Sequence, residues 1–184
     1  MVITLIALVL LLLGGVALMR SFDTSAALAG NIAFRRDLKN QGERGFAAAL
    51  KALKSGALSS TATRTANLGS ANYSASILSS DNQGVPVVLL MSDSGFTGAG
   101  MTLADISDTD SSVKVRYVVE RLCLAAGTFN ASSCVGNLNS CQGGGMDTTG
   151  GTTPGCQSVP VYRISVRADG PRNSQAFLQA MVAM

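Results

Sequence analysis

The four cysteines are the residues of this sequence whose type and spacing could do chemistry. They are separated by ten, six and fourteen residues, in the order Cys123, Cys134, Cys141 and Cys156. A zinc site normally shows paired CxxC motifs or a mixture of cysteine and histidine, and this sequence contains no histidine. We therefore predict two disulfides and no metal. Four cysteines allow three pairings, among them a nested arrangement, Cys123–Cys156 with Cys134–Cys141, which would suit the ends of a hairpin.

Three aspartates, Asp105, Asp108 and Asp110, lie within the stretch DISDTD and raise the question of calcium binding. The stretch lacks the glycine and the distal glutamate of an EF-hand loop, so we expect a solvated turn. The glycine tracts at 143–145 and 150–151 do not connect a strand to a helix, as a phosphate-binding loop does. The serines have no histidine and no suitably placed lysine to activate them. The sequence thus indicates no catalytic residue, no cofactor and no metal, and we do not expect an enzyme.

The composition points away from an ordinary soluble enzyme. Charged residues make up 14% of the 184 residues, whereas soluble domains contain about 25%. Histidine, the commonest general base at neutral pH, is absent. The net charge of +3 is too small to indicate a nucleic-acid-binding protein, which carries a clustered basic face. Most catalytic and nucleic-acid-binding functions are therefore disfavoured.

An uncharged apolar segment, Val2–Met19 (VITLIALVLLLLGGVALM), opens the sequence. Its length is at the threshold for a membrane-spanning helix, which needs ~20 residues. A secretory signal peptide would begin with basic residues, and Met1 is followed directly by apolar ones. A plain membrane anchor and the stem of an assembling filament both fit the segment better.

The charges that follow this segment conflict with the cysteines. Arg20, Arg35, Arg36 and Lys39 all lie on its C-terminal side, so the positive-inside rule would keep the rest of the chain in the cytoplasm. Four cysteines in a loop-rich region instead favour an oxidising compartment, in which disulfides persist. The conflict disappears if a short basic leader preceded Met1 and was removed. We therefore expect a processed chain whose amino terminus is Met1.

Helix-forming residues continue beyond the apolar segment. Ala26–Lys54 contains no proline and places apolar residues at helical spacing, opposite a charged face. We predict one helix from about Met1 to Leu53, in which each internal glycine costs about 1 kcal/mol relative to alanine and makes a soft point. The predicted organisation is an N-terminal helix over residues 1–55, apolar over 1–19, and a globular head over 56–184 with a disulfide-rich loop at 123–156.

The head alternates loops with short strand patterns. Val113–Leu122 alternates apolar and charged residues, which predicts a strand with Val115, Tyr117 and Val119 facing inward and Lys114, Arg116 and Glu120 facing outward. The other predicted elements are a long loop at Leu58–Asn82, a strand at Val85–Met91, turns at Ser92–Asp110, a loop at Ala125–Ser158, a strand at Val161–Arg167 with Tyr162, Ile164 and Val166 inward, a turn at Asp169–Asn173 and a strand at Ala176–Val182. We predict an α+β fold: the second half of the helix packs on one face of an antiparallel sheet of about four strands, and the other face stays in water.

Several stretches resemble the type IV pilins, and in particular the PilX-type minor pilins of Gram-negative bacteria. The matching stretches are Gly15–Arg20 (GVALMR), Leu28–Asn31 (LAGN), Phe46–Leu50 (FAAAL), Tyr117–Cys123 (YVVERLC) and Tyr162–Gln179 (YRISVRADGPRNSQAFLQ). They cover both ends of the chain, in the family's order, but not its Ser/Thr-rich middle. The resemblance favours pairing Cys123 with Cys134 and Cys141 with Cys156, because similar pilin heads have a disulfide like the first.

The resemblance implies a structural subunit of a type IV pilus, with roles in pilus assembly, adhesion or motility. It implies insertion in the inner membrane, cleavage by a prepilin peptidase, methylation at Met1, and transfer by the assembly machinery into an extracellular fimbrium. Leu5, Leu12, Gly14 and Gly15 would pack against other pilin subunits in the filament core. Many major pilins have a glutamate near the position of Leu5, and some PilX-type stems lack it.

Two other functions fit the same sequence. A major filament subunit or a type II secretion pseudopilin would share the layout. A membrane-anchored periplasmic binding module would use the apolar segment only as an anchor and would hold a ligand in its long loops.

Overall fold

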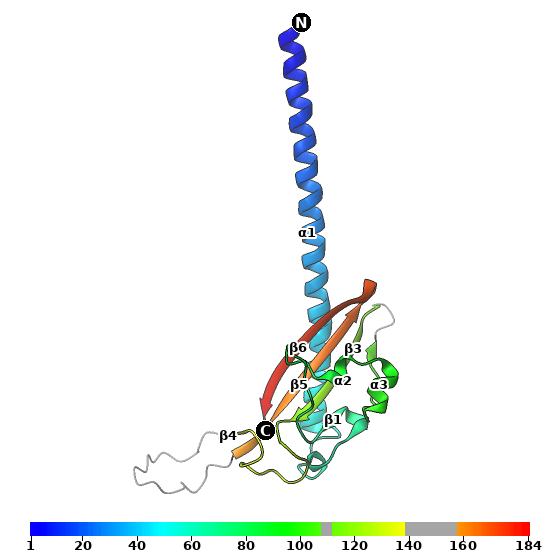
Figure 1. The fold of residues 1–184 in the computed structure, drawn as a ribbon, viewed down its shortest axis with the longest axis vertical. Helices are drawn as coiled ribbons and strands as arrows, with labels where there is room; N and C mark the ends of the chain where they lie inside the picture. Colours follow the sequence, from blue (N-terminus) through cyan, green and yellow to red (C-terminus); the bar gives the residue numbers. More distant parts are fainter. Residues whose placement is uncertain (108–111, 139–157) are drawn as a thin grey trace, which may run out of the picture. The chain divides into compact units, whose positions relative to one another are not determined.

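The structure is a computed structural model that describes residues 1–107, 112–138 and 158–184 (Figure 1). The chain divides into two compact units, residues 1–38 and residues 39–184. One helix, α1 (Val2–Ser55), makes up the first unit and continues into the second. The prediction of a single long N-terminal helix is therefore confirmed, and the helix ends two residues beyond Leu53.

The N-terminal part of the first unit, Val2–Met19, is an uncovered apolar helix. Near its N-terminus α1 contains a window of 18 residues that is long and apolar enough to cross a membrane, judged by length and composition alone. None of that window is buried within the chain, and Leu5 and Leu12 are 65% and 61% exposed. A Cβ added at Gly14 or Gly15 would meet no atom of the described residues within 4 Å. Every side of this segment is therefore available to lipid or to another protein.

The second unit holds the remaining elements. They are the 3₁₀ helices η1 (Thr63–Thr65) and η2 (Gly69–Ala71), strand β1 (Tyr73–Ser74), helices α2 (Val87–Leu90) and α3 (Asp93–Gly98), strands β2 (Ile106–Ser107), β3 (Lys114–Arg121), β4 (Gly136–Leu138) and β5 (Ser158–Gly170), the 3₁₀ helix η3 (Pro171–Asn173) and strand β6 (Ser174–Ala183). The predicted strands at Val113–Leu122, Val161–Arg167 and Ala176–Val182 correspond to β3, β5 and β6.

β5 is the centre of the sheet. It pairs antiparallel with β3 on one side and with β6 along almost its whole length on the other, and β4 pairs with its first residues. β2 joins β3 antiparallel, whereas β1 joins β3 parallel. The described residues thus form a mixed sheet of six strands, not an antiparallel sheet of about four. The missed strands β1, β2 and β4 contain two or three residues each, too few to show an alternating pattern.

One face of the sheet is the apolar face that the strand patterns predict. The buried residues on it are Val115, Tyr117 and Val119 of β3 and Tyr162, Ile164 and Val166 of β5. The last turns of α1 cover this face with a stripe of buried residues at helical spacing, Gly42, Gly45, Ala49 and Leu53. The helix of the second unit and the three long strands therefore share one core.

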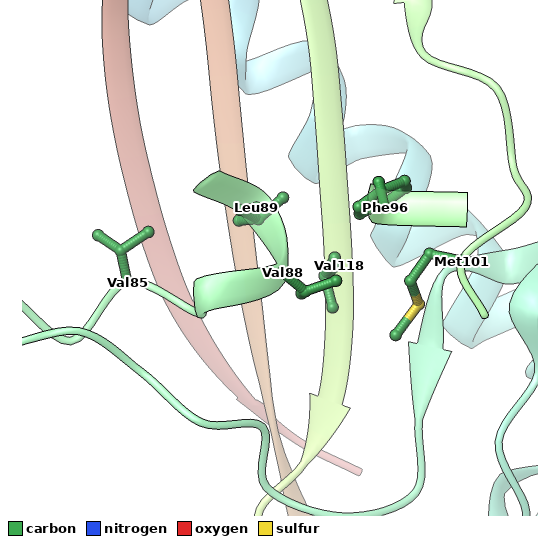
Figure 2. Close-up of a cluster of buried hydrophobic side chains, with 6 residues drawn as sticks. All are labelled: Val85, Val88, Leu89, Phe96, Met101 and Val118. Atoms are coloured by element: carbon green, nitrogen blue, oxygen red, sulfur yellow. The ribbon is translucent and has the colours of Figure 1, made fainter. Parts of the chain in front are cut away.

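The opposite face is buried as well, which corrects the prediction that it stays in water. Residues 77–107, which we call the covering segment, return across β3 and β5. Figure 2 shows the apolar cluster that they form with β3, composed of Val85, Val88, Leu89, Phe96, Met101 and Val118. Every residue of β3 from Val115 to Arg121 is consequently buried, including the arginine and the glutamate predicted to face solvent.

Within the covering segment, the strand predicted at Val85–Met91 is wrong. Residues Val87–Leu90 form the helix α2, directly after Pro86, whose carbonyl oxygen accepts a hydrogen bond from the N–H of Leu89 at 2.9 Å. Proline suits the start of a helix because it has no N–H to donate. A short apolar run does not distinguish a buried strand from a buried helical turn by its period, and here the helical turn buries Val88 and Leu89 against the sheet.

Two of the predicted connections lie wholly within the described residues and have different outcomes. The turn at Asp169–Asn173 is confirmed: Arg172 and Asn173 adopt the left-handed conformation, with φ of 58° and 59°, and connect β5 to β6. The long loop at Leu58–Asn82 is largely irregular, as predicted. It also contains η1, η2 and β1, whose backbone pairs with β3.

Candidate functional site

Two glycines set the distance between α1 and the sheet. A Cβ added at Gly45 would lie 2.7 Å from Cγ1 of Val166 and 2.9 Å from Cγ1 of Val115. A Cβ added at Gly42 would lie 2.6 Å from Cδ1 of Leu178. All three distances are shorter than a Cβ atom tolerates, so the helix backbone contacts these side chains directly, an approach that glycine permits because it has no Cβ. Glycines that the sequence presents as soft points therefore have a packing role in the head.

A disulfide joins Cys123 and Cys134 just after β3. It is the first of the two pairs that the pilin resemblance favours, and it excludes the nested arrangement. The same two residues form an isolated antiparallel bridge, so the disulfide links neighbouring extended segments. A disulfide that closes a loop of this length contributes roughly 3 kcal/mol in the chain-entropy model. The other predicted pair, Cys141 with Cys156, lies outside the described residues.

Arg116 of β3 holds both ends of the stretch that contains α3. It is 4% exposed, and its guanidinium donates to both carboxylate oxygens of Asp105, at 2.7 and 2.8 Å, and to Asp93 at 2.5 Å. It also lies over the ring of Phe96, 4.4 Å from the centroid. The hydrogen bond from Arg116, with its positive charge, lowers the pKa of the Asp93 carboxyl group. Bidentate pairing of this kind is the strongest form of arginine–carboxylate contact.

A second ion pair fastens the start of the covering segment. Glu120 of β3 is 1% exposed and accepts hydrogen bonds from Nε of Arg163 at 2.5 Å and from the backbone N–H of Leu78 at 2.6 Å. Nη2 of Arg163 donates to the hydroxyl of Ser80 at 2.9 Å. A buried carboxylate is tolerated when it is paired and hydrogen-bonded in this way.

Arg167 of β5 completes this set. Its Nε donates to Asp169 at 2.7 Å, and its Nη1 donates to the carbonyl oxygens of Leu89 and Met91 at the end of α2. Charged residues on alternating positions of β3 and β5 therefore bind the covering segment through its backbone and its carboxylates. Sequence reasoning assigned this face to water and missed the contacts.

A further arginine caps the end of α1. Arg64, from η1, is 7% exposed and donates to the carbonyl oxygens of Leu58 at 2.5 Å, of Ser59 at 2.9 Å and of Leu53 at 3.4 Å. The last carbonyl groups of a helix lack partners within it, and a cation near them also interacts favourably with the helix dipole. The carbonyl oxygen of Arg64 itself accepts a hydrogen bond from the hydroxyl of Tyr73 at 2.7 Å, and burial raises the pKa of that tyrosine.

Of the three candidate calcium ligands, the structure describes only Asp105. Asp105 is the bidentate partner of Arg116, and Asp108 and Asp110 lie outside the described residues, as do the glycine tracts at 143–145 and 150–151. Within residues 1–107, 112–138 and 158–184, no three metal-ligating side chains lie close enough to hold an ion.

A scan against protein-family models, a search of curated proteins and a search of solved structures each found no match.

Proposed function

We propose that the chain is a structural subunit of a surface filament, a type IV pilin of the minor, PilX-like kind. The observation that carries the proposal is the helix α1. Its N-terminal part is uncharged and exposes its apolar side chains, whereas its turns from Gly42 to Leu53 belong to the core of the head. No non-helical residue interrupts α1 between Val2 and Ser55. A helix of this kind is suited to join an apolar assembly surface to a folded head.

The same apolar surface can serve in two surroundings. In lipid, a helix satisfies its own backbone hydrogen bonds and needs only apolar side chains. In a filament, the same side chains would pack against the helices of other subunits. Gly14 and Gly15 leave the backbone of the helix accessible, and small residues of this kind allow helices to approach closely.

The proposed role specifies where the subunit is located and which proteins it contacts. The subunit is inserted in the inner membrane of a Gram-negative bacterium with its head exported, and it then moves into an extracellular pilus. The Cys123–Cys134 disulfide supports export, because disulfides persist in oxidising compartments. The partners are other pilin subunits, the prepilin peptidase and the pilus assembly machinery. The role involves no catalytic step.

Substitution of Gly14 separates a filament stem from a plain membrane anchor. Gly14→Ile keeps the segment apolar, so membrane insertion should be unchanged. In a packed filament core the added side chain costs about 1–3 kcal/mol, which corresponds to a loss of about 5- to 150-fold in incorporation. The measurement is the amount of protein in sheared filaments relative to the membrane fraction, with Gly14→Ala as the matched control.

The outcomes distinguish the candidates. Loss of Gly14→Ile from sheared filaments, with the control retained, is the expected result. If the unchanged protein never enters the sheared fraction, and if variants that shuffle Ile3–Leu13 at constant composition function normally, the segment is an anchor. A membrane-anchored binding module would then replace the filament subunit as the proposed function.

A further inference from the structure

A pocket in the head is lined by two buried arginines that the filament role does not use. It has a volume of about 460 Å³, within the range of about 300–1,000 Å³ that is typical of small-molecule sites. Arg64 and Arg121, which line it, are 7% and 2% exposed. Three of its other lining residues, Thr61, Ala62 and Thr128, are exposed to solvent.

Arg121 has unused donors. Its Nε donates to the carbonyl oxygen of Ala75 at 3.1 Å and its Nη2 to that of Gly127 at 2.7 Å. A guanidinium carries five N–H groups, so both N–H groups of Nη1 and one of Nη2 have no partner among the described residues. No carboxylate of the described residues lies within 4.0 Å of this cation.

Arg64 also lacks a carboxylate partner in the described part of the chain. Its Nε and Nη2 are used by the cap of α1, and one N–H of Nη1 reaches the hydroxyl of Tyr162 at 3.4 Å. The arginines on the other face of the sheet are all paired: Arg116, Arg163 and Arg167 each have a carboxylate oxygen within 2.7 Å. Burying a cation without an anion is costly. The two arginines of the pocket therefore form a site that an anion would complete.

We propose that this pocket binds the carboxylate of an acidic sugar. The planar fork of a guanidinium matches the two oxygens of a carboxylate. The hydroxyl groups of Thr61, Thr65 and Thr128 can exchange hydrogen bonds with sugar hydroxyls, and the rings of Tyr162 and Phe129 offer flat apolar surfaces to a sugar ring. The volume leaves room for the body of such a ligand beside its carboxylate.

The test is calorimetric titration of the full chain in detergent with glucuronate. Glucose serves as the neutral sugar, acetate as the carboxylate without a sugar, and inorganic phosphate as a different anion. Glucuronate should bind at least about tenfold more tightly than each of the three, and its affinity should fall as sodium chloride is raised. Free and polymeric uronate, compared at equal carboxylate concentration, distinguish a soluble sugar from a surface polysaccharide as the source.

A blocking variant keeps the test independent of folding. Ala62→Phe adds a bulky ring at an exposed residue that lines the pocket and makes no hydrogen bond with either arginine, and it should weaken glucuronate binding at least about tenfold. Ala99→Phe, on an exposed residue that does not line the pocket, should leave it unchanged. Arg121→Lys keeps the charge but not the fork and should also weaken binding.

Three results would overturn the inference: equal binding of glucose and glucuronate, no binding of glucuronate, or full binding by Ala62→Phe. Equal binding of acetate or phosphate would refute the acidic sugar as the ligand. Because the readout is binding in detergent, it is separate from recovery in sheared filaments, and either proposal can fail alone.

Discussion

Replacing Gly45 by alanine tests how tightly α1 packs on the sheet. The new methyl group would lie 2.7 Å from Cγ1 of Val166 and 2.9 Å from Cγ1 of Val115. Both valines are buried and, being β-branched, have few alternative rotamers, so the helix or the strands must shift. Overpacking typically costs about 1–3 kcal/mol, and because the added methyl group meets two buried valines we expect the upper part of that range, about 2–3 kcal/mol. The better helix propensity of alanine returns about 1 kcal/mol. We expect a net loss of about 1–2 kcal/mol in the free energy of unfolding.

Gly42→Ala is the matched comparison, three residues earlier on the same face of α1. The three atoms nearest to its added methyl group all belong to Leu178: Cδ1 at 2.6 Å, Cδ2 at 3.6 Å and Cγ at 3.7 Å. The close atom is the end of a flexible side chain that can rotate away. The gain in helix propensity should therefore offset the cost, and stability should stay within about 0.5 kcal/mol of the unchanged chain.

Thermal unfolding of the full chain in detergent measures the difference. The near-ultraviolet signal of Tyr73 and Tyr162, both in the core of the head, follows the head and is insensitive to the detergent-bound helix. A loss of 1 kcal/mol lowers Tm by about 2–4 °C in a domain of roughly this size, so Gly45→Ala should melt about 2–8 °C lower. Equal Tm values for the two variants would refute the close packing at Gly45. Adding Val166→Ala should restore part of the loss only if the clash is real.

The remaining predictions concern cross-links of the head. Replacing Cys123 and Cys134 by serine should lower the free energy of unfolding by roughly 3 kcal/mol in urea denaturation, and an unchanged midpoint would contradict a restraining disulfide. Glu120→Ala should cost about 3–5 kcal/mol in the same assay, because it leaves the partly buried Arg163 without its carboxylate partner; a loss under about 1 kcal/mol would count against the ion pair. Arg116 lowers the pKa of Asp93 in the folded state. The stability that this pair contributes is therefore fully present above the ordinary pKa of aspartate, and it is lost as the pH falls toward the lower pKa of Asp93 in the folded chain. Between pH 5 and pH 3 the unchanged chain should therefore lose more stability than Asp93→Asn, and parallel pH profiles would refute the linkage.

The sequence patterns predict the parts of the fold that depend on local order. The alternation in Val113–Leu122 and Val161–Arg167 identifies two strands and the inward position of their apolar residues, because the side-chain period of a strand is local. The long helix is predictable for the same reason. The opposite face of the sheet is not, since Arg116 and Glu120 look like solvent-facing residues until the covering segment returns over them. The one hint in the sequence is that two aspartates, Asp93 and Asp105, precede β3 in a chain with few charged residues, and could therefore pair with its arginine.

The roles of particular glycines and arginines depend on tertiary partners. Judged from the sequence alone, Gly42 and Gly45 only lower the helix propensity of α1. Their packing role is recognised only when the positions of Leu178, Val115 and Val166 are known. Arg64 lies in a segment without periodicity, so neither its position at the end of α1 nor its place in the pocket could be predicted. Such residues are identified by what they contact and not by their spacing.

The position of β5 in the sequence has a consequence for the order of folding. This central strand comes from residues 158–170, so a nascent chain that has emerged only to residue 157 contains β3 but not the strand that pairs with it along its length. The buried stripe of α1, Gly42, Gly45, Ala49 and Leu53, then lacks the β5 part of the sheet on which it packs. The β5–β6 hairpin forms locally through a short turn, whereas β3 must find β5 across some 40 to 55 residues, and pairings of such separation are slow. The head therefore completes late, and until then its apolar helix face and unpaired strand edges are open to chaperones and to aggregation.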